Sequence, residues 1–404
     1  MLNPILGYNL DRDSVSYLTI AKRVAEGDYF RSVNGLWSPM NSWLLAPFIQ
    51  QGKDAWQSAK LLNFIFGFVI LIQIFFLFKK FFLQNIAVYI MQFASAICMV
   101  CFVYFQMFGD VLQLIFVLVY LLLLFQKNKN SISLFQSILF GILMGIGFYA
   151  KAYSLFFFGV HFFITLVWFV YTKKITLKKA ALNYVVGIAT SILIILPWTF
   201  ALHKKYDQWA LNGFAGKLNM SWYINSGKSF KPDIDLLIPP TYNNSPSFFF
   251  FFYITQANLS SPFSSFYPFA IWIARIIHTK IMMIFCFNEI SFLSLSILLI
   301  GFFYFFIVKK KSKIEHHYFN IRLMIITIII LPLGYLMMHI ETRYIWLNVF
   351  LLMILGAKLI ELAFKHVTIK PYLLYIFYFI LAYSFVVFPI YQFQNLKNKN
   401  KDLF

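Results

Sequence analysis

Long runs of apolar residues, separated by short polar loops, recur along most of the chain. Each run holds about 20 residues, the length that crosses the roughly 30 Å hydrocarbon core of a bilayer as an α-helix. The runs are continuously apolar and do not alternate as barrel strands do, so they favour helices over a β-barrel. The sequence therefore predicts an all-α integral membrane protein, a multi-span helical bundle with outward-facing loops and interfacial helices.

The predicted spans divide the chain into four regions. The spans lie near 59–78, 85–106, 110–126, 132–150, 153–171, 181–200, 289–308, 320–338, 344–364 and 371–391. The regions are an outer acidic loop with short helices (1–55), an N-terminal helical bundle (56–200), a long outer loop with interfacial helices (201–288) and a C-terminal helical bundle (289–404).

Some apolar segments do not read as spans. Residues 13–26 have a short helical pattern, and Trp37 to Ile49 is short and interrupted by proline, so it predicts a re-entrant or interfacial helix. Residues 266–287 mix apolar and basic side chains, a pattern typical of a helix in the membrane interface. The alternative is a spanning helix with snorkelling basic residues, which would invert the topology of everything after it.

Lysine residues gather in every second polar loop. They are Lys79-Lys80, Lys127 and Lys129, Lys173-Lys174 with Lys178-Lys179, Lys309-Lys310-Lys311 with Lys313, and Lys365 with Lys370. The positive-inside rule makes these loops cytoplasmic, so the opposite loops face outward. We therefore attribute the net charge of +20 to helix orientation and to contact with anionic membrane lipid, and exclude a nucleic-acid partner.

Both ends of the chain oppose this orientation. The C-terminal tail, with Lys397, Lys399 and Lys401, would lie outside. The N-terminal segment would also lie outside, with no preceding helix to translocate it. We expect that the sequence starts late and lacks a first helix; a span count that is off by one is the alternative.

The three cysteines, Cys98, Cys101 and Cys286, form no disulfide framework and have no metal-binding spacing with histidine. Cys98 and Cys101 lie within an apolar run, so we expect packing roles for them. The chain also lacks a P-loop, an HExxH zinc helix, a GxSxG elbow and a zinc-finger spacing. It therefore encodes no nucleotide-driven energy source.

Candidate chemistry lies in the few acidic residues, because the chain has only 14 Asp and Glu among 404 residues. Asp11, Asp13 and Asp110 lie at outward ends of the pattern, where a carboxylate can ligate a divalent cation or deprotonate a hydroxyl. The alternatives are solvated loop acids at the first two positions and a helix N-cap at Asp110.

Basic residues accompany these acids on the same predicted side. Lys151 lies between two apolar runs and can bind a phosphate as a point charge, or simply snorkel at the membrane boundary. Arg343 can grip a phosphate with its planar fork, held by Glu341, with His339 just before. A local ion pair and a structural histidine are the alternatives. Because these acidic and basic residues lie on the same predicted side of the membrane, we expect a functional site on the outer face.

Together these residues resemble the GT-C glycosyltransferases, multi-span enzymes that use polyprenyl-phosphate sugars and include protein O-mannosyltransferases and bacterial lipid A sugar transferases. Asp13, Tyr17 and Ala21 match the spacing of the family's first outer loop, whereas Ser14 stands where the family usually has a glutamate, and Asp11 would compensate. The resemblance covers about 350 residues in the family's order, and family members begin with a spanning helix before this loop.

Further elements of the resemblance follow along the chain. They are Ser38 to Leu44 for a Pro-containing stretch, Asp110 for a second acid, Gly141 to Lys151 for a Gly-rich helix ending in Lys, Leu196-Pro197-Trp198 for a helix-ending Pro-Trp, and Glu341 to Tyr344 for an Arg-Tyr element.

The resemblance implies an inverting glycosyl transfer, of a hexose or a pentose, at the outer face of the bacterial cytoplasmic membrane. It implies catalytic roles for Asp13 or Asp11. It implies substrate binding by Tyr17, Asp110, Lys151, His339, Glu341, Arg343 and Tyr344. A divalent cation on Asp11, Asp13 and Asp110 stays open, and no other cofactor is expected.

The implied partners are a polyprenyl-phosphate-linked sugar donor, a glycan, lipid or protein acceptor, and membrane lipid. The rival interpretations are a lipid-linked oligosaccharide flippase, a polymerase with a large outer loop, or an inactive family member, given Ser14. A flippase predicts basic residues in mid-helix and an internal repeat, and neither is clear in this sequence.

Overall fold

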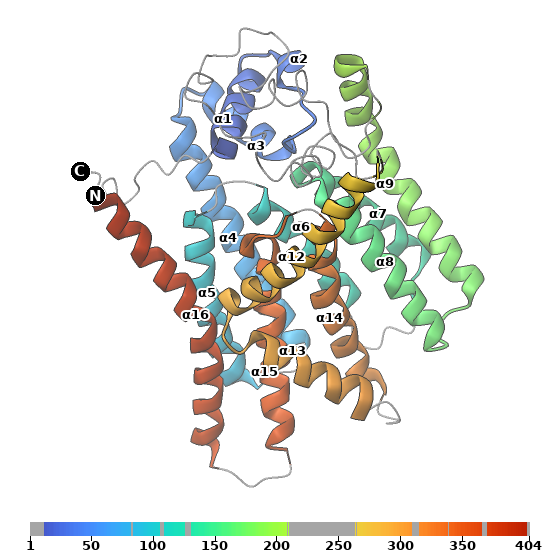
Figure 1. Ribbon diagram of the computed structural model, residues 1–404, viewed down its shortest axis with the longest axis vertical. Coiled ribbons are helices and arrows are strands. Elements are labelled where there is room, and N and C mark those ends of the chain that lie inside the picture. The colour runs from blue at the N-terminus through green and yellow to red at the C-terminus, as the bar shows by residue number, and fades with distance from the viewer. Residues whose placement is uncertain are drawn as a thin grey trace.

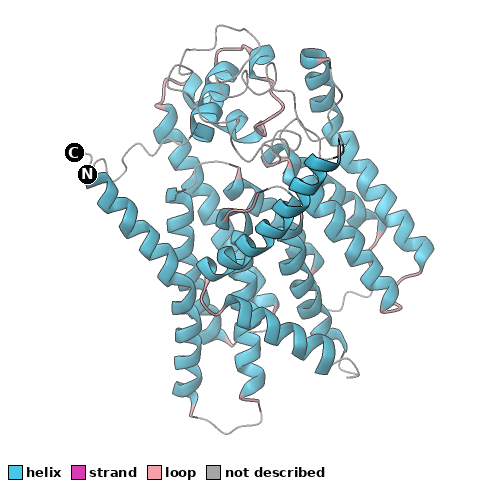
Figure 2. Cartoon of the chain, in the orientation of Figure 1, coloured by secondary structure: helices cyan, strands magenta, loops and turns pink. Residues whose placement is uncertain are grey.

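The protein is all-helical wherever the structure describes it. The computed structural model describes residues 12–81, 84–105, 109–125, 131–207, 209, 263, 265–308, 315–337, 339–365 and 370–401. These ranges contain 14 α-helices with short 3-10 and π segments, and no strand (Figure 2). Eight helices are long and apolar enough to cross a membrane. The predicted multi-span helical membrane protein is thereby confirmed. Asp11 lies outside the described residues, as does the aromatic patch Phe248 to Tyr253.

Three short helices form a cap at one end of the bundle, at the top of Figure 1. They are α1 (Arg12–Ala25), α2 (Tyr29–Ser32) and α3 (Met40–Gln50). The predicted helical pattern over 13–26 is confirmed as α1, and α3 is a helix too short to span. A small apolar core that includes Ile20, Trp37 and Leu45 holds this cap on the first long helix.

Six helices follow the cap and make the N-terminal bundle. They are α4 (Ala55–Lys80), α5 (Asn85–Phe105), α6 (Asp110–Leu124), α7 (Leu134–Ala150), α8 (Tyr153–Tyr171) and α9 (Leu177–Tyr206). Side chains of Asp54, Ser133 and Thr176 cap the starts of α4, α7 and α9. α7 and α9 approach closely because small residues meet there: a Cβ on Gly141 would lie 2.4 Å from the Gly187 carbonyl oxygen.

The expectation that Leu196-Pro197-Trp198 ends a helix is wrong. α9 continues through Pro197 to Tyr206. A proline inside a membrane helix is tolerated where neighbouring helices and local adjustments satisfy the freed backbone groups. The long α9 therefore reaches the cap, where Lys205 Nζ donates hydrogen bonds to the carbonyl oxygens of Val33 (2.5 Å) and Arg31 (3.2 Å).

The C-terminal bundle contains longer and shorter helical pieces. They are α12 (Phe266–Ile290), α13 (Ser294–Phe302), the π-helix η3 (Phe303–Val308), α14 (Glu315–Leu333), the 3-10 helices η4 (Tyr335–Met337) and η5 (Thr342–Ile345), α15 (Trp346–Ala363) and α16 (Pro371–Lys401). α16 is bent in Figure 1, as expected for a helix with an internal proline, Pro389.

The predicted span over 289–308 is wrong at its start. α12 runs on to Ile290, and Ser291 leaves the helical conformation before α13 begins. Ser291 Oγ accepts a hydrogen bond from the Leu293 amide (3.1 Å), and Ser294 Oγ donates to the Phe287 carbonyl oxygen (2.6 Å). Such side-chain bonds to the backbone compete with helix continuation and produce the break.

The segment expected to lie in the interface is α12. It is a single helix of 25 residues that is long and apolar enough to span a membrane. Only 11% of the residues in its apolar stretch are buried against the rest of the protein. In Figure 1 it crosses the front of the bundle obliquely, from beside the middle of α9 toward α13. Two further predicted spans, α6 with 15 residues and α7 with 17, are shorter than most membrane-crossing helices.

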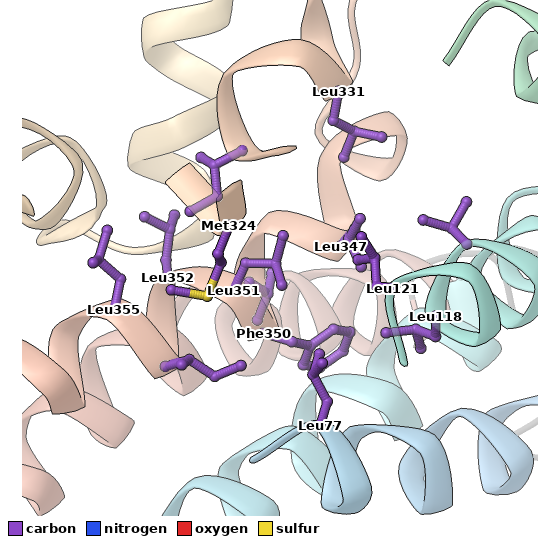
Figure 3. Packing of buried hydrophobic residues seen from close by; sticks show 14 of the residues in the cluster. Leu77, Leu118, Leu121, Met324, Leu331, Leu347, Phe350, Leu351, Leu352 and Leu355 are labelled. Carbon is purple, nitrogen blue, oxygen red and sulfur yellow. The ribbon is translucent and has the colours of Figure 1, made fainter. Parts of the chain in front are cut away.

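α15 is the central helix of the main core. All of its residues from Trp346 to Lys358 are buried, as expected for a helix in the middle of a bundle. Figure 3 shows Phe350 and neighbouring leucines of α15 against Leu77 of α4, Leu118 and Leu121 of α6, and Met324 of α14. Cys98 and Cys101 are buried free thiols, which confirms their predicted packing role.

Candidate functional site

Three charged side chains from distant segments meet beneath the cap. Asp110 is the first residue of α6, Lys151 follows the last residue of α7, and Arg343 lies in η5. Lys151 Nζ forms an ion pair with Asp110 Oδ1, and Arg343 Nε lies 3.9 Å from Asp110 Oδ2. These contacts bring the ends of three chain segments together on one side of the bundle.

The start of α6 explains how Asp110 reaches this position. Gly109 has a φ of +66°, a left-handed conformation that favours glycine, and a Cβ there would lie 3.4 Å from the Tyr17 hydroxyl. Gly109, with no capping side chain, is the N-cap, so the alternative that Asp110 caps the helix is wrong. The Asp110 side chain is only 7% exposed, and a carboxylate buried to this extent needs cationic partners.

Asp13 joins the cluster from α1. Its Oδ2 lies 4.0 Å from Arg343 Nη2, and Trp37 Nε1 donates a hydrogen bond to its Oδ1 at 3.1 Å. The Asp13 side chain is 52% exposed, in contrast to Asp110. Asp13 therefore has both an oriented carboxylate and access to an incoming group, which a general base requires.

Tyr17 lies between the cap and the charged cluster. Burial raises the pKa of Tyr17, and the nearby carboxylates of Asp13 and Asp110 raise it further, so the hydroxyl keeps its proton. The predicted Ser38 to Leu44 stretch anchors this region, since Ser42 Oγ donates to the Tyr17 carbonyl oxygen at 2.9 Å. Ser38 Oγ accepts from the Ala152 amide at 2.9 Å, next to Lys151. The Ser38 hydrogen bond therefore joins the cap to the bundle next to the charged cluster.

Glu341 holds Arg343 as predicted. Arg343 Nε lies 2.7 Å from Glu341 Oε2, and His339 Nε2 lies 3.2 Å from Glu341 Oε1. Burial raises the pKa of Glu341, but the hydrogen bond with His339 and the charge of Arg343 outweigh it and lower the pKa to about 2. Glu341 is therefore ionised at all ordinary pH values.

A stack of three tyrosines supports Lys151. The rings of Tyr153 and Tyr335 stack with centroids 3.7 Å apart, and those of Tyr335 and Tyr344 with centroids 4.4 Å apart. Lys151 Nζ lies 4.0 Å from the centroid of the Tyr344 ring, a cation–π contact. Burial lowers the pKa of Lys151, and Asp110 opposes this shift. The sequence predicted Tyr344 as a site residue but not Tyr153 and Tyr335. The feature that could have indicated these two is their position at the end of an apolar run.

A cavity of about 240 Å³ opens beside the cluster, among α5, α12, η5, α15 and α16. Its walls are formed by Phe102, Glu289, Ile290, Glu341, Thr342, Arg343, Trp346, Val349, Phe388 and Pro389. Arg343 joins the cluster to the cavity, whereas Asp13 and Lys151 are not among its walls. Glu289 was missed by sequence reasoning, although an acid at the end of a long apolar run was a usable signal.

The described residues do not fit a divalent cation. Among them, no three His, Cys, Asp or Glu side chains come together as metal ligands. Asp13 and Asp110 do approach one another, but the Arg343 guanidinium lies within 4.0 Å of both carboxylates. A fixed positive charge thus takes the place that a bridging cation would need.

No family model, curated protein or solved structure matches this chain. The geometry by itself defines what the site can do. A half-exposed carboxylate, Asp13, can accept a proton, and a guanidinium 4.0 Å away, that of Arg343, can stabilise a developing anion. A cavity with a polar end and an apolar end adjoins Arg343.

Proposed function

We propose that the protein is a membrane glycosyltransferase of the GT-C type, which moves a sugar from a polyprenyl-phosphate donor to an acceptor at the outer face of the bacterial cytoplasmic membrane. The observation that carries the proposal is the convergence of Asp13, Asp110, Lys151 and Arg343 at one end of a multi-span bundle. A purely structural ion pair would need neither the exposed carboxylate of Asp13 nor the adjoining cavity.

The proposed reaction is a single displacement at the anomeric carbon. Asp13 takes the proton from the acceptor hydroxyl while that oxygen attacks the anomeric carbon. The bond from this carbon to the phosphate oxygen breaks, and polyprenyl phosphate leaves with the electron pair. Attack opposite to the leaving group inverts the anomeric configuration.

Arg343 and Lys151 have different parts in this proposal. Arg343 borders the cavity and can meet the leaving phosphate, whose negative charge grows as the bond breaks. Lys151 is 21% exposed and is held by Asp110 and the Tyr344 ring, so we assign it a positioning role. It neutralises Asp110, which in turn orients Arg343. Glu341 and His339 hold Arg343 from its other side.

The test is donor turnover by the full chain in lipid nanodiscs. The donors are polyprenyl phosphates carrying a hexose or a pentose, the acceptors come from bacterial membrane extract, and the readout is release of polyprenyl phosphate with transfer of the sugar. We expect turnover by the wild type and a loss of about 10²–10⁴-fold in Asp13→Asn, the usual contribution of a general base. The matched control is Glu26→Gln, which removes the charge of a side chain that is 57% exposed.

Rival functions give other outcomes in the same preparation. A flippase would move the labelled donor across a vesicle membrane without releasing polyprenyl phosphate. A polymerase would lengthen a lipid-linked glycan. Turnover by Asp13→Asn equal to that of the wild type would remove Asp13 as the base, and absence of transfer from every donor would contradict the transferase proposal.

A further inference from the structure

The cavity beside Arg343 has two unlike walls. One wall is polar and consists of Glu289 from α12 with Glu341, Thr342 and Arg343 around η5. The other is apolar and comes from α5, α15, α16 and the end of α12. It includes the Phe102 and Trp346 rings, which stack with centroids 3.9 Å apart and planes 9° apart.

The polar wall carries more negative than positive charge. Arg343 is already paired with Glu341 at 2.7 Å. Glu289 Oε2 accepts a hydrogen bond from Thr342 Oγ1, and no Lys or Arg in the described part of the chain forms an ion pair with Glu289. A phosphate against Glu289 would meet like charge, whereas a ligand with O–H or N–H donors would find a charged acceptor.

The size and the aromatic wall restrict the ligand further. The volume of about 240 Å³ is below the roughly 300–1,000 Å³ of pockets that hold drug-sized ligands, so it suits a single ring. A sugar ring has C–H groups on its faces, which can pack on the Trp346 and Phe102 side, and hydroxyl groups on its edge, which can reach Glu289. These demands match a monosaccharide and disfavour a bare phosphate.

We propose that this cavity is the sugar subsite of the donor and that Glu289 is its specificity-determining residue, accepting hydrogen bonds from hydroxyl or amine groups of one sugar ring. The inference rests on the proposed function. In this arrangement the phosphate stays outside the cavity, away from Glu289 and at Arg343, which lines the cavity wall. Hydroxyl and amine donors share the same chemistry, and the experiment separates them.

The experiment measures binding to the purified full chain in detergent. The probes are citronellyl phosphate, the same phosphate bearing neutral hexoses or pentoses, and counterparts with one hydroxyl replaced by an amine. The variants are Glu289→Gln and Val349→Leu, and the second narrows the cavity without changing charge. Glu26→Gln is the control, and thermal unfolding verifies that each variant is folded.

We expect the wild type to bind at least one sugar-bearing probe more tightly than bare citronellyl phosphate. Glu289→Gln should reduce that preference by about tenfold or more, the effect of losing a hydrogen bond to a charged group, while binding of the bare phosphate stays unchanged. Val349→Leu should reduce it by steric exclusion. A larger loss for the amine probe than for the neutral one would identify a cationic sugar, and equal losses a neutral sugar.

Two results would overturn the subsite. One is a sugar preference that survives Glu289→Gln, and the other is an equal loss for bare citronellyl phosphate, which would make Glu289 a structural residue. Either result, combined with normal sugar transfer by the wild type, leaves the transferase proposal standing. Absence of transfer by the wild type would instead refute the transferase proposal itself.

Discussion

Two groups of polar side chains lie among the helices, and they differ in origin and surroundings. The charged cluster beneath the cap takes Asp110, Lys151 and Arg343 from helix ends and loops. The second group lies within the bundle, where His161 of α8 is 2.8 Å from the Tyr120 hydroxyl of α6 and 2.8 Å from the Thr327 hydroxyl of α14. All three residues of this second group are completely buried.

The difference separates a site from a structural contact. The His161 group joins three helices through neutral hydrogen bonds, which serve membrane helix packing without any access from outside. The charged cluster combines ionised groups, the partly exposed Asp13 and an adjoining cavity. Polarity inside a membrane protein is thus a weak indication of function, and polarity together with charge and access is a stronger one.

The largest effect is expected from Lys151→Met. It leaves the Asp110 carboxylate buried with one cation fewer, and breaking a buried pair from one side costs about 3–5 kcal/mol of unfolding free energy. The double variant Asp110→Asn with Lys151→Met should recover most of this stability but no sugar transfer. Unfolding in detergent measures the first effect. A loss below about 1 kcal/mol would show that the pair behaves as a surface ion pair.

His161→Leu tests the second group of polar side chains, the buried hydrogen bonds around His161. It leaves the Tyr120 and Thr327 hydroxyls with one partner fewer, and we expect a loss of roughly 1–2 kcal/mol of stability. Sugar transfer per folded molecule should stay at the wild-type level. Loss of transfer in a protein of normal stability would instead place His161 in the catalytic machinery.

Arg343→Lys should separate function from folding within the charged cluster. A lysine keeps the charge but cannot reach Asp13, Asp110 and Glu341 together as the planar guanidinium does. We expect donor turnover to fall about tenfold, with a much smaller change in thermal stability. Titration of the donor at saturating acceptor measures the effect, and wild-type turnover would remove Arg343 from the phosphate contact.

The smallest effect is a pH dependence at Glu341. Its pKa is lowered from 4.5 to about 2, so its stabilising contribution is fully present above 4.5 and is lost as the pH falls toward 2. The difference in melting temperature between the wild type and Glu341→Gln should therefore be constant from neutral pH down to about 5 and should shrink below that. A difference that disappears near pH 6 would mean that Glu341 is not held by Arg343.

Much of the helical architecture was predictable because hydropathy depends on local composition. The runs that became α4, α5, α8 and α15 needed no tertiary information. The break after Ile290 was not predictable, since it depends on hydrogen bonds of Ser291 and Ser294 to the backbone. The continuation of α9 through Pro197 likewise depends on neighbouring helices.

Of the candidate site, only the charged residues were predictable from the sequence. Alternation of lysine-rich loops was enough to place Asp110, Lys151 and Arg343 on one side, and their contacts agree. Trp37 and Glu289 were missed because their importance comes from the partners they meet, Asp13 and Thr342, which lie far away in the sequence. Burial of Lys151 against Asp110 also depends on packing, so its positioning role was not visible in the sequence.

The pairing of Asp110 with Lys151 has a consequence for biosynthesis. Both residues leave the ribosome long before Arg343, and only α6, α7 and their connection separate them. The pair can therefore neutralise its own charge while the C-terminal helices are still being synthesised. Arg343 joins only after α14 has been inserted. A nascent chain thus carries these two buried charges as a matched couple from the moment both are available.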